Sequence, residues 1–279
     1  MPHQTATLHT SDNLTLHTES WLPEGEPRAA IVVVHGYGEH LGRYRHVADY
    51  FVKQGYAVYA LDHRGHGQSE GLRAYVHSFN QFVEDLHVYV GQVKSAQAGR
   101  KLFILGHSMG ALISLLYCIR YPDGIAGLVI SGAPVNADAN VPGYLITLGT
   151  VLNQIVPKLP FLKGDDYSVL SRDPEIGRAF ESDPLTWTQP MRIRLGVEIN
   201  RAAGRAREGI GSLKMPILIL HGAADPYVNP SGSQLAYERA GSSDKTIKLY
   251  PNLRHEIMNE PEKYEVLGDI AAWLEAHLG

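Results

Sequence analysis

A serine lies between two glycines in the segment Gly106-His107-Ser108-Met109-Gly110. An apolar run typical of a buried strand, residues 102–105, precedes it, and a helical pattern, Met109–Arg120, follows. A serine in such a strand-to-helix turn projects its hydroxyl from the end of the strand and can attack a carbonyl carbon. Glycines suit the flanking positions because a Cβ there would collide with backbone. We predict that Ser108 is a nucleophile; the alternative is a chance pattern in which it only caps the helix.

A serine hydroxyl is a weak nucleophile at neutral pH and needs a general base, which a third group orients. In hydrolases with this turn the chain order is serine, acid, histidine. Asp225 lies in the loop after an apolar run, residues 217–220, and His255 lies in the loop after another, residues 247–250. We predict that Asp225 orients His255, which activates Ser108. The alternative for Asp225 is a turn aspartate before a proline.

The other histidines have simpler interpretations. His221 closes a strand, and His277 lies in a last helical turn, where it interacts well with the helix dipole. His63 and His66 lie in a glycine-rich loop without further ligands nearby, which disfavours a metal site. The glycine-rich loops also lack the Lys-Ser/Thr ending of a phosphate-binding loop. We therefore predict neither a metal nor a cofactor.

A second loop has the composition of an oxyanion hole. The apolar run Ala29–Val34 continues into His35-Gly36-Tyr37-Gly38-Glu39-His40, whose glycines allow the backbone to approach a substrate oxygen. The expected donors are the backbone N–H of Met109, directly after the nucleophile, and one from this loop, for which we predict Tyr37. The alternative is that the glycines only permit a tight turn.

These side chains need a scaffold that brings several strand ends together. Short apolar runs alternate with helical patterns, including residues 77–93 and a C-terminal segment from Pro261. This alternation predicts an α/β fold with a mostly parallel sheet covered by helices, and residues 5–22 predict an antiparallel hairpin at its edge. From residue 134 to residue 213 no clear buried strand occurs. We interpret 134–213 as a mainly helical cap inserted between two core parts, 1–133 and 214–279.

The composition limits the partners. The 279 residues carry a formal net charge of −4 and a pI of about 6.4, which gives no reason to expect nucleic-acid binding. Cys118 is the only cysteine, so an internal disulfide is excluded. The first thirty residues lack a signal-peptide pattern, and no run of eighteen apolar residues occurs. We expect a cytoplasmic protein.

The chain resembles the monoacylglycerol lipases of the α/β-hydrolase superfamily over nearly its whole length. The matching blocks, apart from the segment around Ser108, are His35-Gly36-Tyr37-Gly38-Glu39-His40 with Arg43 and Tyr44, Asp62-His63-Arg64-Gly65-His66-Gly67-Gln68-Ser69, Val169-Leu170-Ser171-Arg172 and Ser182-Asp183-Pro184-Leu185. The last two lie in the expected cap and are more specific than the serine motif, which many hydrolase families share. The resemblance implies the α/β-hydrolase fold and hydrolysis of a small lipid ester.

The resemblance also implies particular site residues. Ser108, Asp225 and His255 form the implied triad, in agreement with the independent interpretation, and Tyr37 and Met109 are the implied oxyanion donors. Glu39 and Arg43 are implied to lie near a pocket that holds glycerol. Without the resemblance, the pair would be interpreted as a solvated surface ion pair.

Two features depart from the family. Its mammalian members have cysteines around the site, whereas Cys118 lies in the helix after Ser108, which argues against regulation through thiols. Tyr37 is bulkier than the residue usual at its position and narrows the expected pocket.

The expected cap includes a strongly apolar stretch. Residues 141–162 carry a single charge, Lys158. Most of these apolar side chains are expected to pack the cap against the core, and others to line an acyl tunnel or to contact lipid aggregates transiently. The sequence therefore predicts a serine lipase or esterase that acts on monoacylglycerols. The alternatives are a lysophospholipase, a broad carboxylesterase and a catalytically silent lipid-binding homologue.

Overall fold

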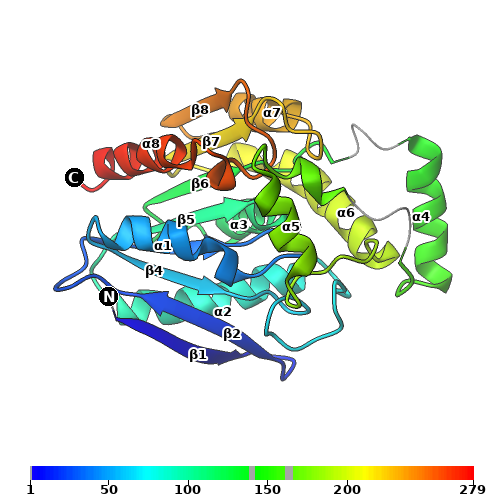
Figure 1. Cartoon of the computed structure of the whole chain (residues 1–279), viewed down its shortest axis with the longest axis horizontal. Helices are drawn as coiled ribbons and strands as arrows, with labels where there is room; N and C mark the ends of the chain where they lie inside the picture. Colours follow the sequence, from blue (N-terminus) through cyan, green and yellow to red (C-terminus); the bar gives the residue numbers. More distant parts are fainter. Residues whose placement is uncertain (1, 138–141, 161–165) are drawn as a thin grey trace.

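The computed structural model describes residues 2–137, 142–160 and 166–279. Within them, eight strands form one sheet in the order β1-β2-β4-β3-β5-β6-β7-β8 (Figure 1). The strands are β1 (His3–His9), β2 (Thr15–Trp21), β3 (Ala29–Val34), β4 (Tyr56–Leu61), β5 (Leu102–His107), β6 (Gly127–Ser131), β7 (Ile217–Gly222) and β8 (Lys245–Tyr250).

The sheet is antiparallel at one edge and parallel elsewhere. β1 pairs with β2 and β2 with β4 in antiparallel register, whereas the strands from β4 to β8 are parallel to their neighbours. The carboxyl ends of the parallel strands therefore meet at one edge of the sheet, where ligands bind in open α/β folds.

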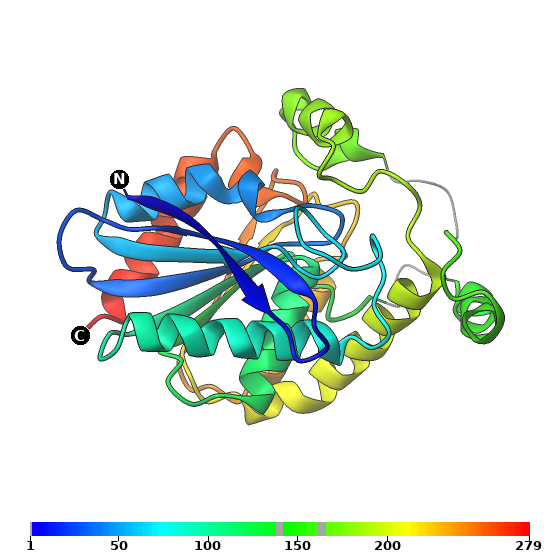
Figure 2. The same ribbon diagram turned by 90° about the horizontal axis from the view of Figure 1, so that it is seen from below.

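The helices cover both faces of the sheet. They are α1 (Arg45–Val52), α2 (Asn80–Ala96), α3 (Met109–Arg120), α4 (Gly143–Ile155), α5 (Pro174–Ser182), α6 (Ile193–Gly209), α7 (Ser231–Arg239) and α8 (Lys263–Ala276), with short 3₁₀ turns η1 (Leu41–Tyr44), η2 (Tyr167–Val169), η3 (Ile210–Ser212) and η4 (Ile257–Asn259). Figure 2 shows α1 and α8 on one side of the sheet and α2 and α3 on the other.

The apolar strand residues alternate between two cores. Val32, Ile104 and Ile130 face the core that contains α2 and α3, whereas Phe103 and Val129 face the core under α1 and α8. Because both faces are covered, the central strands are apolar on both sides and appear in the sequence as continuous apolar runs.

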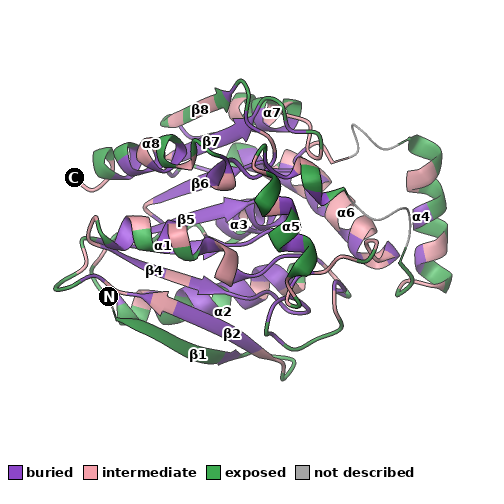
Figure 3. Cartoon of the chain, in the orientation of Figure 1, coloured by how far each residue is buried: buried purple, intermediate pink, exposed green. Residues whose placement is uncertain are grey.

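Between β6 and β7 the described residues form helices and 3₁₀ turns, apart from one isolated bridge between Pro160 and Arg192. α6 packs its small residues Ala202, Ala203 and Ala206 into the core. α4 stands away from the sheet, beyond the carboxyl ends of its strands (Figure 1), and most of it is exposed (Figure 3). The apolar residues Val141, Phe161 and Leu162 lie outside the described residues.

The structure confirms the predicted fold class and corrects details. The predicted helix at residues 77–93 begins later, at Asn80, and the C-terminal helix begins at Lys263, two residues after Pro261. Two helices of the core, α1 and α7, were not predicted; α7 has only a weak apolar pattern, since Gly232, Ser233 and Ala236 are its buried residues. Across the described ranges, no helix combines the length and apolarity that crossing a membrane requires.

Candidate active site

Ser108 occupies a strained turn between β5 and α3. Its φ of 53° and ψ of −120° are rarely adopted by a residue with a side chain. The backbone of this turn packs closely against β3, so Gly110 has no room for a side chain: a Cβ there would overlap the carbonyl oxygen of Val34. The sequence prediction of a strand-turn-helix arrangement around Ser108 is confirmed.

The structure brings together the three residues expected to form a triad. His255 Nε2 lies 3.0 Å from Ser108 Oγ, and His255 Nδ1 lies 2.7 Å from Asp225 Oδ2. Asp225 follows β7 and His255 follows β8, whereas Ser108 follows β5, so three loops at one edge of the sheet supply the three side chains. This arrangement can transfer a proton from Ser108 to His255.

A further histidine, His221, holds Asp225, and sequence reasoning missed this role. His221 Nε2 lies 3.0 Å from Asp225 Oδ2 and 3.0 Å from the carbonyl oxygen of Val228, and both are acceptors. Nε2 therefore carries the hydrogen, and Nδ1 accepts from the Ser233 hydroxyl at 2.6 Å. The four-residue spacing between His221 and Asp225 was the only signal in the sequence.

The electrostatics favour a charged acid and a basic histidine. Burial raises the pKa of Asp225, but the positive charge of His255 and the hydrogen bonds from His221 and His255 outweigh it and hold that pKa well below its usual value. Burial lowers the pKa of His255, yet the charge and hydrogen bond of Asp225 raise it above its usual value. His107, whose ring centroid lies 4.8 Å from that of His255, has a pKa lowered by burial to about 3 and is neutral at pH 7.

The two residues expected to supply the oxyanion donors lie at the cavity of Ser108. Tyr37 and Met109 line the same cavity as Ser108, a hollow of about 200 Å³. Gly36 approaches so closely that a Cβ there would lie 3.2 Å from Ser108 Cβ. Met109 opens α3, and backbone N–H groups in the first turn of a helix have no acceptor within the helix. The role of Tyr37 and Met109 as oxyanion donors stays a prediction.

Glu39 and Arg43 form a buried network, so the alternative of a solvated surface pair is wrong. Arg43 Nη1 lies 2.7 Å from Glu39 Oε2. The guanidinium also donates two hydrogen bonds to the carboxylate of Glu256, from Nη1 at 2.6 Å and from Nη2 at 2.7 Å. Glu39 Oε1 also accepts from the backbone N–H of Gly36 and from the hydroxyl of Tyr44. Glu256, which directly follows the predicted base, was missed, because only the fold brings it to Arg43.

The two carboxyl groups of this network differ in proton affinity. Burial raises the pKa of Glu39, and the nearby Glu256 raises it further. Burial opposes ionisation of Glu256 too, but Arg43 dominates and lowers its pKa to about 2. Glu39 and Glu256 both line the cavity of Ser108. The network therefore places negative charge at the cavity of Ser108.

The histidines of the glycine-rich loop are buried and neutral. Burial lowers the pKa of His63 to about 3 and that of His66 to about 4. His63 Nε2 donates to the carbonyl oxygen of His35, and the backbone N–H of His63 donates to His35 Nε2, both at 3.0 Å. His63 thus supports the loop that contains Gly36 through His35. In the parts of the chain that are described, no group of three His, Cys, Asp or Glu side chains is placed to hold a metal ion.

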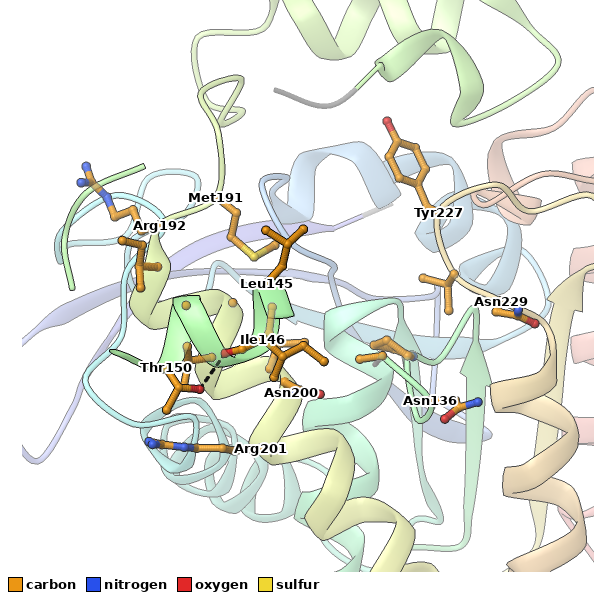
Figure 4. Close-up of a pocket in the computed structure, with 18 residues that line it drawn as sticks. Asn136, Leu145, Ile146, Thr150, Met191, Arg192, Asn200, Arg201, Tyr227 and Asn229 are labelled. Atoms are coloured by element: carbon orange, nitrogen blue, oxygen red, sulfur yellow. Dashed lines mark hydrogen bonds between the residues drawn. The ribbon is translucent and has the colours of Figure 1, made fainter. Parts of the chain in front are cut away.

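A second, larger cavity adjoins that of Ser108. It has a volume of about 390 Å³ and lies between α4, α6 and the loop that follows Asp225 (Figure 4). Leu145, Ile146, Val197 and other apolar side chains form most of its wall. The two cavities share the lining residues Pro134, Met191, Ile199, Tyr227 and Val228. Together they provide a space that extends from the nucleophile to the underside of α4.

The raised pKa of His255 predicts how activity depends on pH. Below that pKa the imidazole is protonated and cannot accept the Ser108 proton, so kcat/KM for a soluble short ester falls about tenfold per pH unit. Asp225→Asn removes the charge that raises the pKa. The acid limb of the profile then shifts to lower pH, and kcat falls on the order of 10⁴-fold by analogy with other serine triads. An acid limb at the same pH in the variant would contradict the assignment of Asp225.

Comparisons with known proteins agree with this geometry. The serine aminopeptidase S33 family matches residues 25–262. The chain is 38% identical to the monoacylglycerol lipase of Mycolicibacterium smegmatis over 92% of both chains, and 35% identical to the human monoglyceride lipase over 98% of this chain and 90% of that protein.

A solved structure gives the same result in three dimensions. The crystal structure of the Paleococcus ferrophilus monoacylglycerol lipase superposes with a TM-score of 0.82 at 32% identity, covering 99% of this chain and all of that one. The resemblance found in the sequence is confirmed. The chain therefore belongs to the serine aminopeptidase S33 family of α/β-hydrolases, in which it is similar to the monoacylglycerol lipases over nearly its full length.

Proposed function

We propose that this protein is a serine esterase that hydrolyses monoacylglycerols to a free fatty acid and glycerol. The observation that carries the proposal is the contact series from Ser108 through His255 to Asp225, at a cavity that shares lining residues with a larger apolar one. A triad specifies acyl transfer, and the cavities select the acyl and alcohol groups. The monoacylglycerol and monoglyceride lipases among the relatives support this substrate class.

The first half of the reaction forms an acyl-enzyme. Ser108 Oγ attacks the ester carbonyl carbon while His255 Nε2 takes the hydroxyl proton, and Asp225 stabilises the imidazolium. The backbone N–H groups of Tyr37 and Met109 donate to the oxyanion of the tetrahedral intermediate. The intermediate collapses when the bond to the glycerol oxygen breaks, and His255 gives its proton to that oxygen.

The second half releases the fatty acid. A water molecule attacks the acyl carbon of the ester on Ser108, and His255 again accepts the proton. The new tetrahedral intermediate collapses, the bond to Oγ breaks, and the proton returns to Ser108. No group outside the chain, water and substrate takes part in these steps.

The acyl chain is assigned to the larger cavity. Its wall is mainly apolar, and its volume of about 390 Å³ lies within the range of small-molecule sites. α4 and α6, which lie in the stretch between β6 and β7, supply Leu145, Ile146 and Val197 to the wall. We therefore interpret 134–213 as a cap that encloses the acyl group.

The alcohol is assigned to the side of the smaller cavity where Glu39 and Glu256 lie. Each carboxylate has about four lone-pair positions, of which the protein occupies three, leaving acceptors for hydroxyl groups. Two carboxylates beside one guanidinium leave a net negative charge. A neutral polyol such as glycerol fits this environment, whereas the phosphodiester of a lysophospholipid is repelled.

The side of α4 that faces solvent favours transient contact with lipid. Tyr144, Leu148, Val151 and Ile155 recur at helical spacing and are exposed, Tyr144 and Ile155 by 71%. α4 contains no charged residue. We assign this exposed stripe to a peripheral contact with the surface of a membrane or micelle that supplies the substrate.

Replacement of the nucleophile tests the mechanism. Ser108→Ala is expected to lower kcat on monoacylglycerol on the order of 10⁶-fold, because no other hydroxyl can take its place. A fluorophosphonate probe labels the wild-type protein and not the variant, as measured by fluorescence after electrophoresis. An unlabelled wild-type protein would instead support a catalytically silent lipid-binding homologue.

A substrate panel tests the alcohol assignment. Monoacylglycerols are expected to give a higher kcat/KM than lysophospholipids with the same acyl chain, and Glu256→Gln reduces this preference because it removes negative charge from the pocket. Release of fatty acid measures both rates, and p-nitrophenyl esters report the intrinsic acyl transfer. Equal rates on both lipids in the wild-type protein would favour the lysophospholipase or broad carboxylesterase alternative.

Charges on the exposed stripe test contact with lipid. Val151→Asp with Ile155→Asp is expected to lower activity on micellar monoacylglycerol about tenfold or more, and to leave hydrolysis of a soluble short ester unchanged, because both residues are exposed. Leu145 is unsuitable for this test, since it lines the larger cavity. Equal losses on both substrates would rule out the interfacial role.

A further inference from the structure

The loop that carries His255 is attached on both sides to the cap. The backbone N–H of Glu256, the next residue, donates to the carbonyl oxygen of Leu170 at 2.9 Å. Arg254, the preceding residue, donates from Nη1 to the carbonyl oxygens of Ser168 and Ser171, at 3.1 Å each. The predicted base thus lies between two residues that are both hydrogen-bonded to residues 168–171.

A buried carboxylate completes the attachment. Glu260 has no exposed surface, and its Oε1 accepts the backbone N–H of Arg254 at 2.6 Å. Its Oε2 accepts from the hydroxyl of Ser171 at 3.1 Å and from the backbone N–H of Arg172 at 2.9 Å. One side chain therefore holds the residue before His255 and two residues of the cap.

The acid loop is attached to the same part of the cap. The hydroxyl of Tyr227, two residues after Asp225, donates to the carbonyl oxygen of Asp166 at 2.5 Å. The ring of Tyr227 also lies edge-on to that of His255, at 5.7 Å between centroids. Among the described helices and strands, α4 packs mainly against α6. The block Val169-Leu170-Ser171-Arg172 is thus bonded to the residues on either side of the predicted base, and it does not line the larger cavity.

We propose that residues 168–172 and Glu260 form a clamp that holds the His255 loop at its catalytic distance from Ser108, with Ser171 and Glu260 as positioning residues. The inference rests on the proposed function of Ser108, Asp225 and His255. A displacement of about 1 Å at a reacting group can cost on the order of 10²-fold in rate, so a loop without regular structure needs such anchors. The clamp supplies them from the cap.

Glu260→Gln tests the clamp with little change in shape. The variant side chain keeps one acceptor oxygen and has an NH₂ group, a donor, in place of the other. The NH₂ group must face either the N–H of Arg254 or the donors of Ser171 and Arg172, and it can form no hydrogen bond with a donor. On p-nitrophenyl acetate, which needs neither the larger cavity nor a lipid surface, kcat is expected to fall about tenfold to a hundredfold with KM nearly unchanged. Ser171→Ala is expected to give a smaller loss of the same kind.

The matched controls are other bonds of the cap. Glu198→Gln changes a buried carboxylate that ties α6 to the core through the backbone N–H of Phe79, and Ser182→Ala removes a hydroxyl that bonds within its own helix. Both are expected to retain wild-type kcat on p-nitrophenyl acetate. If Glu198→Gln lowers kcat as much as Glu260→Gln, the effect is a general loosening of the cap, and the clamp is overturned.

A spectroscopic readout separates positioning from stability. The proton between His255 Nδ1 and Asp225 Oδ2 should give a far-downfield NMR resonance, which is expected to broaden or shift in Glu260→Gln and to stay unchanged in Glu198→Gln. The acid limb of the pH profile moves to lower pH as the contact between His255 and Asp225 weakens, while the charges of Glu39 and Glu256, which also raise the pKa of His255, are retained in the variant. An unchanged resonance and profile would overturn the clamp, whereas full activity in Ser108→Ala would overturn the proposed function itself.

Discussion

Asp225 carries a negative charge on a side chain that water does not reach, and most of the active site follows from how that charge is stabilised. Its Oδ2 lies within hydrogen-bond distance of His221 and His255, and its Oδ1 accepts the backbone N–H groups of Tyr227 and Val228. A buried carboxylate without such donors would take up a proton and could not hold an imidazolium. The loop after β7 therefore has to turn so that its backbone N–H groups donate to the Asp225 carboxylate.

The need to stabilise the charge of Asp225 also constrains elements outside its own loop. Ser233, on α7, bonds to the other ring nitrogen of His221 and favours the tautomer that donates to Asp225, so α7 is part of the support of Asp225. His255 can meet both Asp225 and Ser108 only while β5, β7 and β8 end at one level of the sheet. The negative charge of Glu39 and Glu256 nearby favours the protonated form of His255 as well. Arg43 forms ion pairs with both of these carboxylates.

The sequence contained the local features of the site and few of its long-range contacts. The turn at Ser108 and the chain order of acid and base could be predicted, because each depends on a strand and the few residues after it. His221, Glu256 and Glu260 could not, because their roles come from partners that only the fold brings near. Glu260, between Asn259 and Pro261, has the pattern of a polar surface loop, yet it is completely buried. α7 was missed for a similar reason, since glycine, serine and alanine form its buried face.

The region between β6 and β7 contains two kinds of contact surface, one that bonds to the core through hydrogen bonds and one that is apolar. Residues 166–187 bind the core through hydrogen bonds. One of them runs from the backbone N–H of Trp187 to the carbonyl oxygen of Gly38, in the loop expected to form the oxyanion hole, at 2.7 Å. Directional bonds of this kind fix geometry, which catalytic loops need. α4 contributes apolar side chains both to the larger cavity and to solvent, and apolar contact is non-directional. The proposed acyl group would therefore meet a wall without directional bonds, whereas residues 168–172 hold the His255 loop through directional ones.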